Sequence, residues 1–176
     1  GFYLAQTYLQ YYLADVVRSF QALGRTLTEA PFQAVALLGL LISLGAALAS
    51  VPAGRASDRL GRKPLIYLSG AGLGLLMPFL LLFPRYDLLL ALALVFGLFY
   101  GVYLAVDWAL VADVLKDPEA HATDMGLWQT AIVVPQVLAG AFGRPLDLLN
   151  AQTPGLGYQV LYLLAALFFL LGAFGV

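Results

Sequence analysis

The chain has 176 residues, of which 62% are hydrophobic and 11% are charged, whereas an ordinary soluble domain has about 25% charged residues. This composition excludes a disordered, collagen-like or ordinary water-soluble protein. Nine Lys and Arg residues face ten Asp and Glu residues, so no overall basic charge indicates nucleic-acid binding, and the absence of cysteine excludes disulfides and thiolate metal sites. The remaining class is an integral membrane protein.

Six stretches of the sequence are long and apolar enough to cross a bilayer, which takes about 20 residues of helix. Transmembrane strands alternate apolar and polar residues, but these stretches are apolar on all sides, so we expect helices, whose backbone satisfies its own hydrogen bonds. The sequence therefore predicts an all-α, polytopic transmembrane bundle. Its six predicted helices are Phe2–Val17, Phe32–Ala53, Leu65–Phe83, Leu88–Ala112, Gly126–Leu149 and Tyr158–Val176.

The first predicted helix carries a polar stripe on an otherwise apolar surface. Gln6 and Gln10 are four residues apart, and Tyr3 precedes Gln6 by three, so the three side chains share one face. A polar group inside a helical bundle has to face water or find a partner. The stripe therefore either lines a solute cavity or forms hydrogen bonds between helices that fix their packing.

The break between the second and third predicted helices has a dense charge pattern, and residues 54–64 read GRASDRLGRKP. Gly61 permits a tight turn at positive φ, and Pro64 suits the first turn of the next helix. Asp58 stands beside Arg59, Arg62 and Lys63, so these groups can form a charged latch near the membrane surface. The alternative is a basic loop that only orients the protein by the positive-inside rule.

This segment resembles the signature loop of the major facilitator superfamily, G-x-L-(A/S)-D-R-x-G-R-(K/R)-x. Ala56 departs from the usual Leu. The resemblance implies that the loop is cytoplasmic, that it acts as a conformational latch, and that its Asp also meets the positive end of a helix from the other half of the transporter. The latch residues so implied are Gly54, Asp58, Arg59, Gly61, Arg62 and Lys63.

The fourth predicted helix carries Tyr100, Tyr103 and Asp107 at spacings of three and four residues, which place them on one face. Asp107 is the only carboxylate well inside an apolar stretch. An unpaired, ionised carboxylate there is costly, so we expect it to be protonated, paired or hydrated. It is the candidate for proton coupling or for a gating salt bridge, and the alternative is a helix-end charge that reaches the interface.

Glutamines, glycines and aromatic residues give further expectations. Gln129 and Gln136 are seven residues apart on the fifth predicted helix and could line a cavity, and Pro135 could bend that helix.

Glycines spaced by four residues, which predict close helix approach, occur at Gly70 and Gly74 and at Gly97 and Gly101. Aromatic residues near helix ends predict interfacial belts at Tyr11, Tyr12, Phe83, Tyr86 and Tyr158.

Two later stretches indicate which part of a transporter this is. The segment 106–118 and the segment 124–136, with its DMGLWQ and VPQ, resemble the tenth and eleventh helices of bacterial members related to glycoside and sucrose symporters. Lys116 departs from the Pro of that pattern. The resemblance implies the C-terminal six-helix half. The chain begins at Gly1 and ends within apolar sequence, so we expect residues 1–176 to be one repeat whose N-terminal partner half is missing.

The resemblance implies a secondary active transporter that carries a small solute by alternating access. It would be coupled to an ion gradient, with protons as the first candidate ion. Its substrate would be sugar-like, or it would act in efflux. Its partners would be the lipid bilayer of the bacterial plasma membrane, the solute and protons, without nucleic acid. No nucleotide-binding or hydrolase motif occurs in the sequence, so we expect no enzymatic activity, no cofactor and no metal. The alternative is a six-helix structural or assembly protein that transports nothing.

Overall fold

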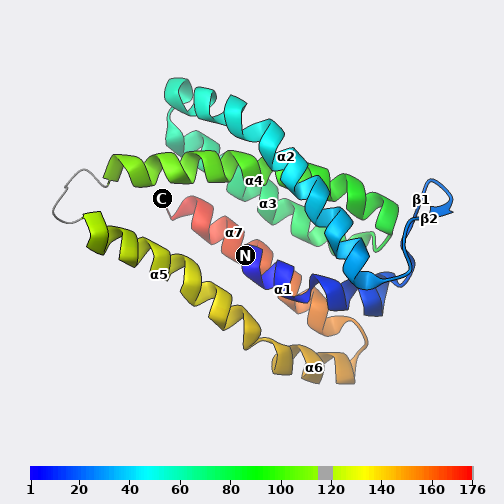
Figure 1. The fold of residues 1–176 in the computed structure, drawn as a ribbon. Coiled ribbons are helices and arrows are strands. Elements are labelled where there is room, and N and C mark those ends of the chain that lie inside the picture. Colours follow the sequence, from blue (N-terminus) through cyan, green and yellow to red (C-terminus); the bar gives the residue numbers. More distant parts are fainter. Residues whose placement is uncertain (115–120, 176) are drawn as a thin grey trace.

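The computed structural model of the chain is a helical bundle with one short hairpin, and it describes residues 1–114 and 121–175 (Figure 1). The predicted all-α class is confirmed, since two strands of two residues each are the only β structure in the described part of the chain. The elements are α1 (Phe2–Tyr12), the π-helical segment η1 (Leu13–Val17), β1 (Gln21–Ala22), β2 (Arg25–Thr26), α2 (Pro31–Leu60), α3 (Arg62–Leu82), α4 (Tyr86–Val114), α5 (His121–Gly140), α6 (Gly143–Gln152) and α7 (Leu156–Phe174).

Five helical spans in the described residues are long and apolar enough to cross a membrane, namely α2, α3, α4, α5 together with α6, and α7. The remaining predicted span, Phe2–Val17, is formed by α1 and η1 with the predicted bounds. Successive spans run in opposite directions (Figure 1). The α2–α3 turn therefore lies at the same end of the bundle as the C-terminal end of α4 and the N-terminal end of α5, and the hairpin and the α6–α7 turn lie at the other end.

Two predicted boundaries were wrong. The signature segment 54–60 is not a loop but the last two turns of α2, because the helix continues through Pro52 and Gly54 and ends only where Gly61 takes a positive φ. The fifth predicted helix is not continuous, since α5 ends at Gly140 and α6 begins at Gly143. Glycine has a low helix propensity, and the Tyr8 hydroxyl donates to the carbonyls of Ala139 at 2.9 Å and Gly140 at 3.2 Å, which satisfies acceptors at the break.

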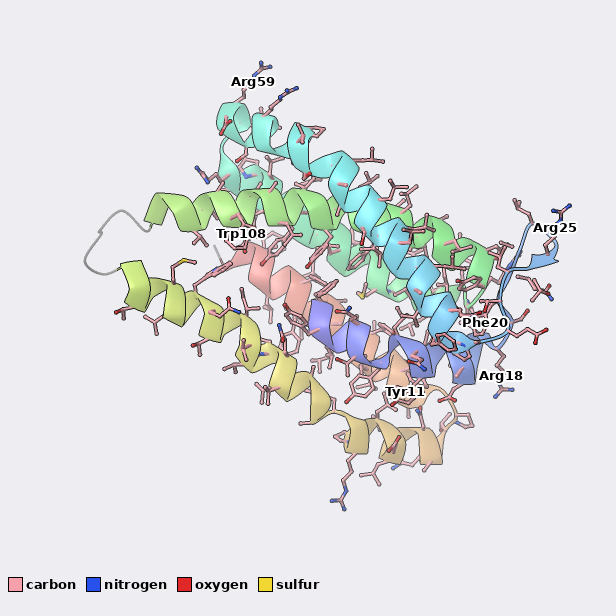
Figure 2. All side chains as sticks on the ribbon, viewed as in Figure 1. Tyr11, Arg18, Phe20, Arg25, Arg59 and Trp108 are labelled. Carbon is pink, nitrogen blue, oxygen red and sulfur yellow. The ribbon has the colours of Figure 1, made fainter. Side chains whose placement is uncertain are left out.

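A β-hairpin occupies the segment 18–29, where the sequence indicated only a charged break. Gln21 pairs with Thr26 and Ala22 with Arg25, and the two turn residues Leu23 and Gly24 both have positive φ, 52° and 75°, as in a type I′ turn. Phe20 is buried at the base of the hairpin with its ring edge-on to Tyr86 at 5.3 Å. This contact attaches the hairpin to the bundle, while Arg25 points away from it (Figure 2).

The predicted glycine pairs do lie where helices approach closely. A Cβ atom added at Gly97 or at Gly101 would collide with the backbone of α2, at Ile42 and at Ala46 respectively. On the other side of the molecule, a Cβ at Gly70 would collide with Ala173, and one at Gly74 would crowd Leu170 of α7. Backbone contact between α2 and α4 and between α3 and α7 therefore depends on these glycines, since a larger residue would force the helices apart.

The predicted aromatic belts were only partly correct. Tyr11 and Phe83 are exposed, as an interfacial position requires, but Tyr12, Tyr86 and Tyr158 are buried inside the bundle. Their hydroxyls find partners on other elements, because a buried hydroxyl without one is costly. Tyr12 donates to the carbonyl of Leu80, Tyr86 to the carbonyl of Ala34 at 2.9 Å, and Tyr158 to the Asp15 carboxylate.

The hydrogen bond of Tyr12 has a specific cause and a measurable consequence. In an α-helix the Leu80 carbonyl would accept from the N–H of residue 84, but Pro84 has none, so the Tyr12 hydroxyl takes its place. A Tyr12→Phe variant leaves this carbonyl unpaired, and we expect it to lower the free energy of unfolding by about 1–2 kcal/mol. The measurement is thermal unfolding in detergent micelles. Tyr11→Phe is the control, because Tyr11 is 60% exposed and forms no such bond; equal loss in both variants would contradict the assignment.

Candidate functional site

The α2–α3 turn has the geometry that the sequence predicts for it. Gly61 is the single residue between the two helices, with φ 84° and ψ 165°. This region of backbone conformation is essentially restricted to glycine. Pro64 lies in the first turn of α3, where its missing N–H costs nothing. The tight turn at Gly61 and the position of Pro64 are therefore confirmed.

The charged side chains around this turn differ in exposure. Asp58, Arg59 and Lys63 are exposed and Arg62 is half-buried, and Arg59 extends from the tip of α2 away from the bundle (Figure 2). Within the described residues, the Asp58 carboxylate forms no ion pair with these bases. The carboxylate is therefore available to a partner that is not one of these neighbours. Gly54, the other residue of the predicted latch, is half-buried within α2.

A pocket of about 240 Å³, open to the surface, is lined by α1, α2, α3, α4 and α7. Two of the predicted substrate residues, Gln6 on α1 and Tyr100 on α4, line it. The Tyr100 ring stacks on Phe2 with 4.6 Å between centroids and an angle of 6° between planes. Phe96 stacks on both rings at 6.2 Å. These aromatic rings form a continuous wall that joins the start of α1 to the middle of α4.

The other predicted substrate residues do not line this cavity. Gln10 is exposed on α1, one turn beyond Gln6. Tyr103 and the half-buried Asp107 follow Tyr100 along α4, toward the end of the bundle that carries the α2–α3 turn. Gln129 and Gln136 are exposed on α5. The structure therefore brings together Gln6 and Tyr100, and the other predicted substrate residues lie outside the pocket that these two line.

The two α5 glutamines lie on the side of that helix that turns toward α1. Gln129, Gln136 and Ala139 follow one another at intervals of seven and three residues, which place them on one helix face. Ala139 is buried and accepts the hydrogen bond from Tyr8 of α1. Nearer its start, α5 contacts α4 through Trp128, whose ring lies edge-on to Trp108 at 4.7 Å.

Sequence reasoning missed two polar groups of the cavity, Ser43 on α2 and Tyr162 on α7. Tyr162 is fully buried, and its hydroxyl has no hydrogen-bond partner among the described residues. The available signal was a single tyrosine within the apolar stretch LYLLAALFFLLG at residues 161–172. The cavity holds no charged side chain, and the described residues contain no group of three potential metal ligands.

The model of the family described as Major Facilitator Superfamily matches residues 2–176. The chain belongs to the major facilitator superfamily. Searches of curated proteins and of solved structures return no significant match. Membership makes the chain a multi-pass membrane protein of a non-enzymatic transporter family, which confirms the predicted family and the expectation that it is not an enzyme. The match extends over all of the helices, so the turn at Gly61 and the cavity belong to one facilitator-superfamily bundle.

Proposed function

We propose that this facilitator-superfamily chain is the C-terminal six-helix half, residues 1–176 as one repeat, of a secondary active transporter that carries a small solute by alternating access. The observation that supports this is the exposure of four glutamines: Gln129 and Gln136 on a helical span long and apolar enough to cross a membrane, and Gln6 and Gln10 on α1, which belongs to the predicted span Phe2–Val17. An amide side chain that faces hydrocarbon leaves its polar atoms unsatisfied. This face therefore suits a water-filled path and a second bundle, as a two-half transporter provides.

The latch role of the α2–α3 turn is part of this proposal. Gly61 fixes the two helices in a tight hairpin, and Asp58 presents an exposed carboxylate without an ion pair to a described residue. A carboxylate is favoured at the positive N-terminal end of a helix, so Asp58 suits a helix end of the other half when the cytoplasmic side closes. Arg59, Arg62 and Lys63 would hold the turn at the anionic inner surface of the bacterial plasma membrane.

Coupling to protons is proposed to involve Asp107. Its side chain is half-buried in α4, one and two turns beyond Tyr103 and Tyr100, within a helix long enough to cross the membrane. Ionisable groups at such a depth mark ion and proton paths by default. The likeness of residues 107–136 to sugar-linked symporters makes a sugar one candidate solute, and an efflux substrate is the other. No observation favours the structural or assembly role.

Transport by an Asp58→Asn variant tests the proposal. We expect the initial rate of solute-dependent proton movement to fall about tenfold, the scale of a hydrogen bond to a charged group. The measurement uses proteoliposomes loaded with a pH-sensitive dye and a panel of sugars, organic acids and neutral aromatic compounds. Asp87→Asn is the matched control, since Asp87 pairs with Arg85 at 2.7 Å at the opposite end of the bundle.

The structural alternative gives a different result in the same assay. It predicts no solute-dependent flux in any preparation, with normal insertion of both variants. If flux occurs and Asp58→Asn lowers it no more than Asp87→Asn does, the latch role of Asp58 is wrong.

A further inference from the structure

The last two turns of α2 carry a pair of arginines, Arg55 and Arg59, on one helix face. Both side chains are exposed, and neither forms an ion pair with another described residue. Because they are four residues apart, about 5–6 Å separates their Cβ atoms. Two guanidinium groups at this spacing can bind one phosphate group together, since each presents a fork of N–H donors. A groove beside them is lined by Pro52, Arg55, Ala56, Arg59 and Leu60.

Exposed apolar side chains continue this face from the arginines toward the middle of α2. Leu44, Leu48 and Pro52 precede Arg55 at intervals of four, four and three residues, which keep them on one face of the helix. Leu44 is 50% exposed and Leu48 is 61% exposed. The distance from Leu44 to Arg55 is about 16 Å of helix, or half of the roughly 30 Å of hydrocarbon in a bilayer. The face is therefore apolar over the depth of one leaflet and cationic at its surface.

The arginine face differs from the face that carries Asp58. Consecutive residues leave an α-helix about 100° apart, so Asp58 and Arg59 point in different directions, and Arg59 extends away from the bundle (Figure 2). The interior of the bundle lies on a further side, where Ser57 is buried. If Asp58 meets the other half of a transporter, a step that rests on the proposed function, the arginine face is left to the surrounding lipid.

We propose that this face of α2 binds an anionic phospholipid, whose phosphate group pairs with Arg55 and Arg59 and whose acyl chain lies along Leu44 and Leu48. Basic residues at the membrane surface attract anionic lipids. A zwitterionic lipid brings a second cation close to the guanidinium groups, which weakens that attraction. A soluble phosphate carries the charge but has no chain to cover the leucines. The groove therefore selects a ligand that has both a net negative charge and an acyl chain.

Native mass spectrometry of the purified protein in detergent, titrated with phosphatidylglycerol, tests this proposal. We expect Arg55→Gln to weaken phosphatidylglycerol binding about fivefold, and the double variant Arg55→Gln with Arg59→Gln to weaken it at least about tenfold, the scale of the attraction between an arginine and anionic lipid. Phosphatidylcholine should bind more weakly than phosphatidylglycerol, and equimolar glycerol 3-phosphate should not displace the lipid.

Arg25→Gln is the matched control, because Arg25 is exposed on the hairpin at the opposite end of the bundle. This variant should bind phosphatidylglycerol as the unmodified protein does. Thermal unfolding accompanies each titration, and the midpoints should not change, since the three arginines have no ion pair to lose among the described residues.

Four results would overturn the proposal. Equal weakening by Arg25→Gln and by the double variant would show a response to total charge rather than to this groove. Equal affinity for phosphatidylcholine would remove the requirement for net charge, and displacement by glycerol 3-phosphate would indicate a soluble ligand. Binding to residues 1–176 but not to the two-half transporter would mean that the other half covers this face. The titration measures no transport, so its failure leaves the proposed function standing, and absence of solute flux leaves the lipid site standing.

Discussion

A Gly97→Val variant is expected to lose most of its folded protein. A Cβ atom at this position would lie 2.8 Å from the Ile42 Cα and closer still to its carbonyl oxygen. Overpacking of a side-chain core costs about 1–3 kcal/mol, but here the obstructing atoms are backbone and cannot rotate away. We therefore expect a loss in the free energy of unfolding of more than about 3 kcal/mol. The measurement is the monodisperse fraction in size-exclusion chromatography, together with the thermal midpoint.

Gly172→Val is the matched control for Gly97→Val. Gly97 lies inside α4 and Gly172 inside α7, but nothing lies within 4 Å of a Cβ atom added at Gly172. The control should express and unfold as the unmodified protein does. A Gly97→Val protein that is equally monodisperse and stable would show that α2 and α4 do not meet backbone to backbone in the membrane.

The second large effect is expected from Gly61→Ala. Gly61 has φ 84° and ψ 165°, a backbone conformation that is strained for alanine. The strain lowers the free energy of unfolding by about 1–3 kcal/mol. The strain is relieved only if the turn changes shape, which moves the end of α2 relative to the start of α3. We expect transport to be lost while most of the bundle remains folded, because the glycine contacts of α2 with α4 are far along the helix from the turn. The measurement is solute-dependent proton flux beside thermal unfolding.

Gly172→Ala controls for the general effect of replacing a glycine. It lies in a regular helix with free space around it, and alanine has the higher helix propensity by about 1 kcal/mol. This variant should be slightly more stable and transport normally. Unchanged flux in Gly61→Ala would mean that the turn geometry is dispensable.

The bundle itself could be predicted from the sequence, because crossing a bilayer imposes length and hydropathy on each span independently of tertiary contacts. The turn at Gly61 was predictable for a related reason, since glycine followed by proline three residues later restricts the backbone locally. The close approach at Gly97 and at Gly70 was also predictable, as a four-residue spacing of glycines leaves one face of a helix without side chains.

The hairpin, the break between α5 and α6 and the buried tyrosines could not be predicted, because each depends on a contact between distant segments. Phe20 fixes the hairpin through Tyr86, and Tyr8 satisfies the carbonyls at the end of α5. In an apolar sequence an interfacial and a buried tyrosine have the same local neighbours. The same limit applies to the cavity: the sequence showed the glutamine stripe, but only packing shows that Gln6 shares a pocket with Tyr162 while Gln129 does not.

Helix α5 is held mainly at its C-terminal end, so it can tilt about that end. Tyr8 fastens it at Ala139 and Gly140, and its other described link is the edge-on pair of Trp128 with Trp108. Trp128 precedes Ala139 by 11 residues, or about 16 Å of helix, so a tilt of about 10° around the fastened end would carry the indole some 3 Å. An edge-on ring contact tolerates less than that. Small rotations at the end of α5 that Tyr8 holds would thus be amplified into separation of α4 from α5 at the end of the bundle where the Gly61 turn lies.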